Sequence, residues 1–369
     1  MKNLIVGNGV IIQHGGLTYS NREIIKRAIN NIERGQFSKD AYPEETATML
    51  KVLHKEIPAI AEGDYDDMAV LKGERGNLDR VKCIYGRNTK IYDVGFEDYF
   101  LIFELVCRKN KITNPDKSNT REMLKRMFLD SIYNKGRINE VYKNFSPKFQ
   151  EYLLSFDNIF TTNYDQNIEL VTNTEIHYLH GQFNKLHFVY DRNSLKNKLP
   201  NSDKFFVEPT KGYEHVFSTA LTSDSGESKS YSRKQVDLTN SGLEKFANGF
   251  REGKVEMSVL NEWTLSENKI IRDLGEAIKL KLDNPEAKME EQYAYGVFER
   301  MEGEIEILGL SPLNDNHIFE EINNSGCEVN YYFYSDGECD RIGEKYPNYK
   351  LSSTKEFWQK CSVYNNAGC

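Results

Sequence analysis

A chain of 369 residues can build two or three hydrophobic cores, and a composition of 39% hydrophobic and 28% charged residues is typical of a soluble globular protein. The net charge of −8 provides no overall basic surface, so we expect no direct binding of nucleic acid. Apolar runs of about 18 residues, which membrane-spanning helices need, are absent, and we expect neither a membrane span nor a signal peptide.

The cysteines give a second exclusion. Six of them are scattered along the chain, and no two form a C-x-x-C pair. A zinc knuckle needs closely spaced thiolates to complete its tetrahedron, so we expect no zinc module and no metal. Scattered thiols without a signal peptide also fit a reducing compartment, and we predict a cytoplasmic protein.

Near the N-terminus, the apolar residues 3–6 predict a short buried strand that ends at Gly7-Asn8-Gly9. Glycines let the backbone turn tightly and approach a ligand, although the same residues could form an ordinary turn. Ser20 predicts the start of a helix, with Glu23 as its capping-box partner. The intervening His14-Gly15-Gly16 segment is expected to form a loop, either over a ligand site or in solvent.

Residues 41–145 are predicted to be mainly helical because their apolar side chains recur at helical spacing. Two such stripes, within residues 96–107 and 123–132, have the aromatic and Met content of a packed core. We interpret this region as a helical cap inserted between the first two strands of a sheet. Glu97 could face a site, but acidic residues favour the first turn of a helix, and a solvated position is the preferred interpretation.

Two strands follow whose ends carry polar side chains. The apolar strand of residues 158–162 continues into Asn163-Tyr164-Asp165, and after a short helix a second strand ends at His180-Gly181. Open α/β sheets bind ligands at such strand ends, so these groups predict a site. Two alternatives stay open, since Asn163 and Asp165 could form an Asx turn that caps a helix, and His180 could be a buried structural histidine.

Residues 182–262 are polar and are expected to form an irregular insertion. Lysines, arginines and aromatic residues between 185 and 206 could bind nucleic acid, but interspersed acidic residues favour a solvated surface. Beyond the insertion, apolar spacing predicts a helix over residues 267–282.

The C-terminal part restores the alternation of strands and helices. A strand at Glu304–Leu308 is followed by Gly309-Leu-Ser311, and then by a helix for which Asn314 or Asp315 is the predicted N-cap. A further strand is expected at residues 329–334. Residues 336–369 are expected to supply closing helices.

Three of these segments together resemble the sirtuin family, and more closely the sirtuin-like NAD hydrolases of bacterial antiphage defence. They are Ile5–Gly9, the Thr161–Asp165 loop with His180-Gly181, and Ile307–Asp315. The resemblance implies an α/β fold with a Rossmann-like parallel sheet of sirtuin type. Residues 1–40 and 146–369 would form this NAD-binding domain, with residues 41–145 as its helical insertion and 182–262 as a polar one.

The resemblance also implies roles for individual residues, with NAD⁺ as the substrate. Asn163 and His180 match the family's catalytic pair, in which an amide holds water or ribose hydroxyls and an imidazole accepts a proton. The remaining positions would bind the dinucleotide. They are Gly7, Asn8 and Gly9 at the diphosphate and nicotinamide ribose, Thr161 and Asp165 in the ribose loop, and Gly309, Ser311 and Asn314 at the adenosine half.

The function implied is that of an NAD⁺ glycohydrolase, which releases nicotinamide and ADP-ribose and depletes cellular NAD⁺ in abortive infection. Such an enzyme needs restraint, so a homo-oligomer is expected, with a HerA-type hexameric ATPase or translocase as the implied partner. One alternative is a catalytically silent sensor of NAD or ADP-ribose. Another is a sirtuin-type deacylase or ADP-ribosyltransferase, which the missing cysteine pairs disfavour.

Overall fold

The computed structural model describes residues 1–36, 46–70, 72–113, 116–186, 209–220, 227–288 and 293–362. The chain forms two compact units. Unit 1 comprises residues 1–185, 210–229 and 293–369, and unit 2 comprises residues 186–209 and 230–292.

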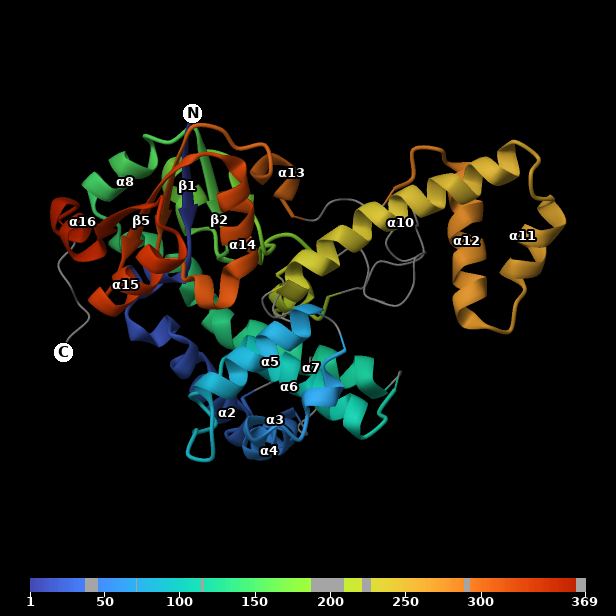
Figure 1. Ribbon diagram of the computed structural model, residues 1–369, viewed down its shortest axis with the longest axis horizontal. Coiled ribbons are helices and arrows are strands. Elements are labelled where there is room, and N and C mark those ends of the chain that lie inside the picture. The colour runs from blue at the N-terminus through green and yellow to red at the C-terminus, as the bar shows by residue number, and fades with distance from the viewer. Residues whose placement is uncertain are drawn as a thin grey trace. The chain divides into compact units, whose positions relative to one another are not determined.

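Unit 1 is built on a six-stranded sheet in which every neighbouring pair is parallel (Figure 1). The strands are β1 (Lys2–Val6), β2 (Asn158–Thr161), β3 (Ile176–Tyr178), β4 (Glu304–Leu308), β5 (Glu328–Phe333) and β6 (Lys350–Ser353). Their order is β3-β2-β1-β4-β5-β6, the order of a doubly wound, Rossmann-like sheet. The direction of winding reverses between β1 and β4, and ligands bind at the carboxyl ends of strands beside such a reversal.

Both faces of the sheet are covered, which is why the central strands β1 and β4 are buried over most of their length. Figure 1 shows α13 (Tyr295–Phe298) and α14 (Pro312–Ser325) on one side, and α8 (Pro147–Leu153) and α16 (Thr354–Lys360) on the other. On the first side, α15 (Asp336–Lys345) joins the same core. The second side is rich in aromatic contacts, among them those of His14, Phe149 and Trp358.

A helical layer completes unit 1 and has its own core. Its helices are α2 (Asn21–Glu33), α3 (Thr46–Lys55), α4 (Ile57–Glu62), α5 (Lys72–Ile84), α6 (Phe96–Lys109) and α7 (Asp116–Tyr133), followed by the 3-10 segment η3 (Asn134–Asn144). The two predicted apolar stripes lie on α6 and α7, where Phe100 and Phe128 are fully buried and their rings are in contact. This part of the chain is helical as predicted.

Unit 2 contains α10 (Glu227–Arg251, assigned to this unit from residue 230), α11 (Met257–Thr264) and α12 (Lys269–Asp283) around a small apolar core. The prediction of irregular structure was therefore wrong for residues 227–262, which are mostly helical. The predicted helix at 267–282 corresponds to α12. Residues 187–208, which hold most of the basic and aromatic positions noted above, lie outside the described part of the chain. No described helix is long and apolar enough to cross a membrane.

Three local predictions near the termini need correction. A helix, α1 (Asn8–Gly15), begins directly after Gly7, so His14 lies in a helix and packs against Phe145 and Phe149 instead of forming a loop. Ser20 does precede α2, but its side chain makes no capping hydrogen bond. Residues 350–353 form the edge strand β6, where only helices were expected.

Candidate functional site

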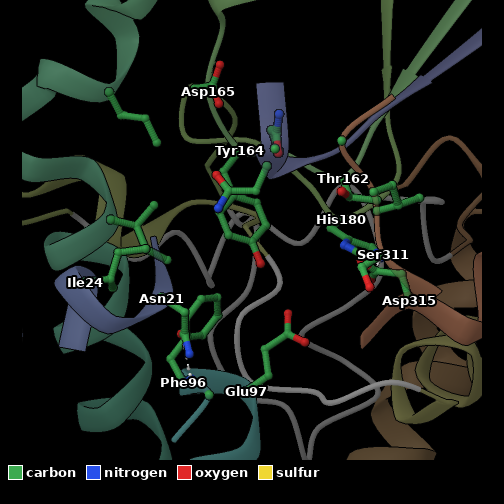
Figure 2. Close-up of a pocket in the computed structure, with 18 of the residues that line it drawn as sticks. Asn21, Ile24, Phe96, Glu97, Thr162, Tyr164, Asp165, His180, Ser311 and Asp315 are labelled. Carbon is green, nitrogen blue, oxygen red and sulfur yellow. Dashed lines mark hydrogen bonds and ion pairs between the residues drawn. The ribbon is translucent and has the colours of Figure 1, made fainter. Parts of the chain in front are cut away.

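A cavity of about 360 Å³ lies in unit 1 at the carboxyl ends of the central strands, beside the reversal between β1 and β4 (Figure 2). Turns after β1, β2, β3 and β4 form one wall, and residues from α2, α6, α7 and η3 form another. The lining residues are Asn8, Gly9, Asn21, Ile24, Gly95, Phe96, Glu97, Asp98, Ile132, Ile138, Thr162, Asn163, Tyr164, Asp165, His180, Gly309, Leu310, Ser311 and Asp315.

The first turn of α1, which follows β1, and the turn after β4 meet backbone to backbone at the wall of this cavity. The amide of Gly9 donates a hydrogen bond of 2.8 Å to the carbonyl of Gly309. Gly309 has a φ of +70°, and a Cβ atom there would lie 2.7 Å from the amide nitrogen of Val10. Only glycine combines a positive φ with so close an approach of another backbone, so the packing of these two segments against each other is sufficient to explain Gly309.

Asn163 connects the turn after β2 to the turn after β1. Its side-chain Nδ2 donates to the carbonyl of Gly7 at 3.3 Å, and its backbone amide donates to Oγ1 of Thr161 at 3.0 Å. The hydroxyl of Thr161 in turn donates to the carbonyl of Val6 at 3.1 Å. These bonds hold a largely buried amide at the cavity wall, with its Oδ1 atom remaining as an acceptor for a hydroxyl group or water.

Asp165 lies in the same turn, two residues before the next helix, α9 (Asn167–Thr172). Its Oδ1 atom accepts hydrogen bonds from the backbone amide of Asn167 and from that residue's side-chain Nδ2. Its Oδ2 atom is buried without a hydrogen-bond partner among the described residues. Burial raises the pKa of this carboxyl group to about 6, although the bonds from Asn167 oppose the shift.

His180 follows β3 and is 2% exposed. Its Nε2 atom lies 3.2 Å from Nε2 of His317 and 3.8 Å from Oδ1 of Asp315, both on α14. Gly181 after it has a φ of +79°, and a Cβ atom there would lie 2.1 Å from the carbonyl oxygen of Thr219. The His-Gly pair therefore lets the chain turn beneath residues 218–220 and leaves the imidazole at the cavity.

The helical layer supplies the opposite wall. The side-chain Oδ1 of Asn21 accepts a hydrogen bond of 3.1 Å from the amide of Phe96, which fixes the start of α6. In Figure 2 the carboxylate of Glu97 extends from that helix start into the space facing Ser311 and Asp315. Glu97 therefore lies in the first turn of a helix, as preferred from the sequence, and it also faces the site, which was the alternative.

The charges around the cavity are predominantly negative. Glu97, Asp98, Asp165 and Asp315 line it, and no lining residue among those described is Lys or Arg. Asp98 is paired with Arg80 and accepts a hydrogen bond of 2.6 Å from the hydroxyl of Tyr85. Such a wall favours a positively charged ligand or a transition state that develops positive charge.

Most of the residues singled out from the sequence converge on this cavity. Asn163, His180, Asn8, Gly9, Asp165, Gly309 and Ser311 all line it. Gly7 and Thr161 do not line it, and they instead hold Asn163 in place. The side chain of Asn314 lies outside the described part of the structure.

The start of α14 differs from its prediction. Ser311 is the N-cap, and its hydroxyl accepts from the amide of Leu313 at 3.4 Å. Asp315 lies inside the helix, although its backbone is not helical there.

The residues that sequence reasoning missed are those of the helical wall, together with His317. Nothing in the local pattern of Asn21, Ile24 or Ile138 distinguishes a cavity position from a core position. His317 carried a usable signal, because a buried helix face rarely holds an imidazole without a polar partner.

In comparisons with known proteins, no family model, no curated protein and no solved structure matches this chain.

Proposed function

We propose that this protein is an NAD⁺ glycohydrolase with a Rossmann-like sheet of the sirtuin type. The observation that carries the proposal is the convergence of Asn163, His180 and Gly309 on one cavity at the reversal point of a parallel sheet. In this reading the helical segment 41–145 caps the substrate, and no zinc module takes part.

The chemistry of the bond matches the charge of the cavity. Nicotinamide leaves as a neutral molecule, and the ribose passes through a state that resembles an oxocarbenium ion. Carboxylates such as that of Glu97 stabilise this positive charge. Asn163 would hold water or a ribose hydroxyl through its Oδ1, and His180 would accept the proton as the new bond to oxygen forms.

The cellular role is proposed from the same resemblance. Hydrolysis of NAD⁺ in the cytoplasm would starve an infected cell, so that the protein would act as the effector of an antiphage system. An activity of that kind needs an inactive state, and we propose that a homo-oligomer and a HerA-type hexameric translocase control it.

The test is the release of nicotinamide from NAD⁺ by purified protein, with and without that partner. Asn163→Ala should lower the rate by at least about 100-fold, the size of effect seen when a group that acts only in the transition state is removed. Asn158→Ala is the matched control, because Asn158 starts the same strand at the end remote from the cavity and its side chain donates to Asn3.

Equal rates for Asn163→Ala and the wild type would remove Asn163 from the mechanism. Tight binding of NAD⁺ by calorimetry, with no nicotinamide released under any activating condition, would replace hydrolysis with the sensor alternative.

A further inference from the structure

Two imidazoles and one carboxylate meet at the edge of the cavity. His180 comes from the end of β3, and Asp315 and His317 come from the first turns of α14. Their ligand atoms all lie within 4.8 Å of one another, and both imidazoles are less than 4% exposed. Nitrogen and oxygen donors of this kind are the usual ligands of divalent transition metals.

The distances are close to those around a bound ion. Zinc lies about 2.0–2.1 Å from an imidazole nitrogen, so two tetrahedral imidazole ligands have nitrogens about 3.4 Å apart. The two Nε2 atoms are 3.2 Å apart, and Oδ1 of Asp315 is 3.8 Å from Nε2 of His180. Rotation of one carboxylate would complete three ligands.

The backbone of α14 is shaped for this arrangement. Residues two apart on a regular helix do not face each other, so Asp315 and His317 could not share an ion on an undistorted helix. Asp315 departs from helical geometry, with φ −118° and ψ 32°. The departure occurs at the residue whose carboxylate must turn toward His180.

We propose that His180, Asp315 and His317 bind one divalent transition-metal ion of the Zn²⁺ class. The imidazoles would coordinate through Nε2 and carry their protons on Nδ1. The remaining coordination position would face the cavity, which His180 and Asp315 both line. While the ion is bound, His180 cannot accept a proton, so the ion would inhibit nicotinamide release. This inhibition rests on the proposed function, whereas the binding of the ion does not.

Cobalt(II) titration of the full-length, chelator-treated protein is the primary test. One Co²⁺ per chain should bind and give the weak visible bands of nitrogen and oxygen ligands, without the intense near-ultraviolet band that thiolate ligands produce. Zn²⁺ should then displace it. Absence of binding, or a spectrum dominated by thiolate, would overturn the proposal, since the chain also carries free cysteines.

Substitutions locate the ion. His317→Gln and Asp315→Asn should each weaken Co²⁺ binding by more than the about 10–100-fold loss typical of residues that merely support a ligand. His215→Gln is the control, because His215 is also a buried histidine bonded to a carboxylate, at 2.6 Å from Asp130, but no second imidazole is bonded to it in the part of the chain that the structure describes. Unchanged affinity in both test variants, with circular dichroism of the native protein, would refute the site.

The inhibition is measured separately, as the ratio of nicotinamide release with and without Zn²⁺ within each protein. The ratio should fall well below one for wild type and stay near one for Asp315→Asn. Binding of the ion without inhibition would support the metal site and refute its proposed effect on nicotinamide release. Absence of any nicotinamide release would count against the proposed function and leave the Co²⁺ result to decide the site.

Discussion

Replacement of Asp165 by Asn should increase the stability of unit 1 over that of the wild type more at pH 8 than at pH 4. An aspartate in an unfolded chain ionises near pH 3.9, whereas burial raises the pKa of Asp165 to about 6. Between these values the unfolded chain has lost a proton that the folded chain retains. Rising pH therefore favours unfolding, and the favourable contribution of Asp165, complete below pH about 4, is lost by pH about 6 to 7.

The size of the effect follows from the pKa difference. A shift of about two units corresponds to about 3 kcal/mol, at about 1.4 kcal/mol for each unit. Asn is nearly isosteric, and its Oδ1 can keep the bonds from Asn167, so the substitution removes mainly the charge. The figure refers to the free energy of unfolding of the variant minus that of the wild type, which should be about 3 kcal/mol larger at pH 8 than at pH 4. Any cost of the substitution that does not depend on pH cancels in this comparison.

Urea unfolding followed by tryptophan fluorescence measures this difference for unit 1 alone. The chain has two tryptophans, Trp358 in unit 1 and Trp263 in unit 2, so a Trp263→Phe background leaves a reporter only in unit 1. The free energy is taken at each pH from midpoint and slope. Asp340→Asn serves as the control, because this aspartate is exposed on α15 and water solvates its charge in both states.

The reasoning is refuted if the free energy of unfolding of Asp165→Asn differs from that of the wild type by the same amount at pH 4 and pH 8. It is also refuted if the variant becomes less stable relative to the wild type as the pH rises. Either result would mean that ionised Asp165 is solvated or paired in the folded protein, in conflict with its buried Oδ2 atom.

Two further substitutions test the packing and the charge of the cavity. Gly309→Ala should destabilise unit 1 by about 1–3 kcal/mol because its backbone is left-handed, and the contact with Val10 should add a further loss, so the unfolding midpoint should fall. Gly337→Ala is the control, because its Cβ atom would meet open space. Equal unfolding midpoints for the two variants would contradict the argument. Glu97→Gln should slow nicotinamide release on the order of tenfold, because the substitution removes a carboxylate that would stabilise the positive charge of the transition state. Glu140→Gln on the exposed part of η3 should leave the rate unchanged, and an unaltered rate in Glu97→Gln would show that its charge plays no part.

Local patterns in the sequence were sufficient for the central sheet and for one wall of the cavity. β1, β2, β4 and β5 are short segments rich in apolar residues and bounded by glycine or polar residues, and the polar groups at their ends, such as Asn163, were readable one segment at a time. β6 was missed because an edge strand needs few apolar residues, and Lys350–Ser353 has only Leu351. The start of α1 was missed because glycines at Gly7 and Gly9 suggested a longer turn.

The opposite wall was beyond local reasoning, because its position depends on how the helical layer packs against the sheet. Glu97 illustrates the difficulty. An acidic residue at the first turn of a helix is favoured by the helix dipole wherever the helix points, so its sequence position carries no information about the cavity. An imidazole on the buried face of a helix indicates that His317 has a polar partner, but not which one, since His180 is 137 residues away along the chain.

The charge of the cavity also determines which end of a dinucleotide would enter it under the proposed function. A diphosphate placed between Glu97 and Asp315 would be repelled, and the amide of Gly9 is already bonded to Gly309 and cannot be offered to a phosphate. The pyridinium of NAD⁺ carries the opposite charge and would be attracted to the same carboxylates. Under the proposed function the nicotinamide ribose would therefore lie beside Asn163 and His180, and the diphosphate would lie outside this group of carboxylates.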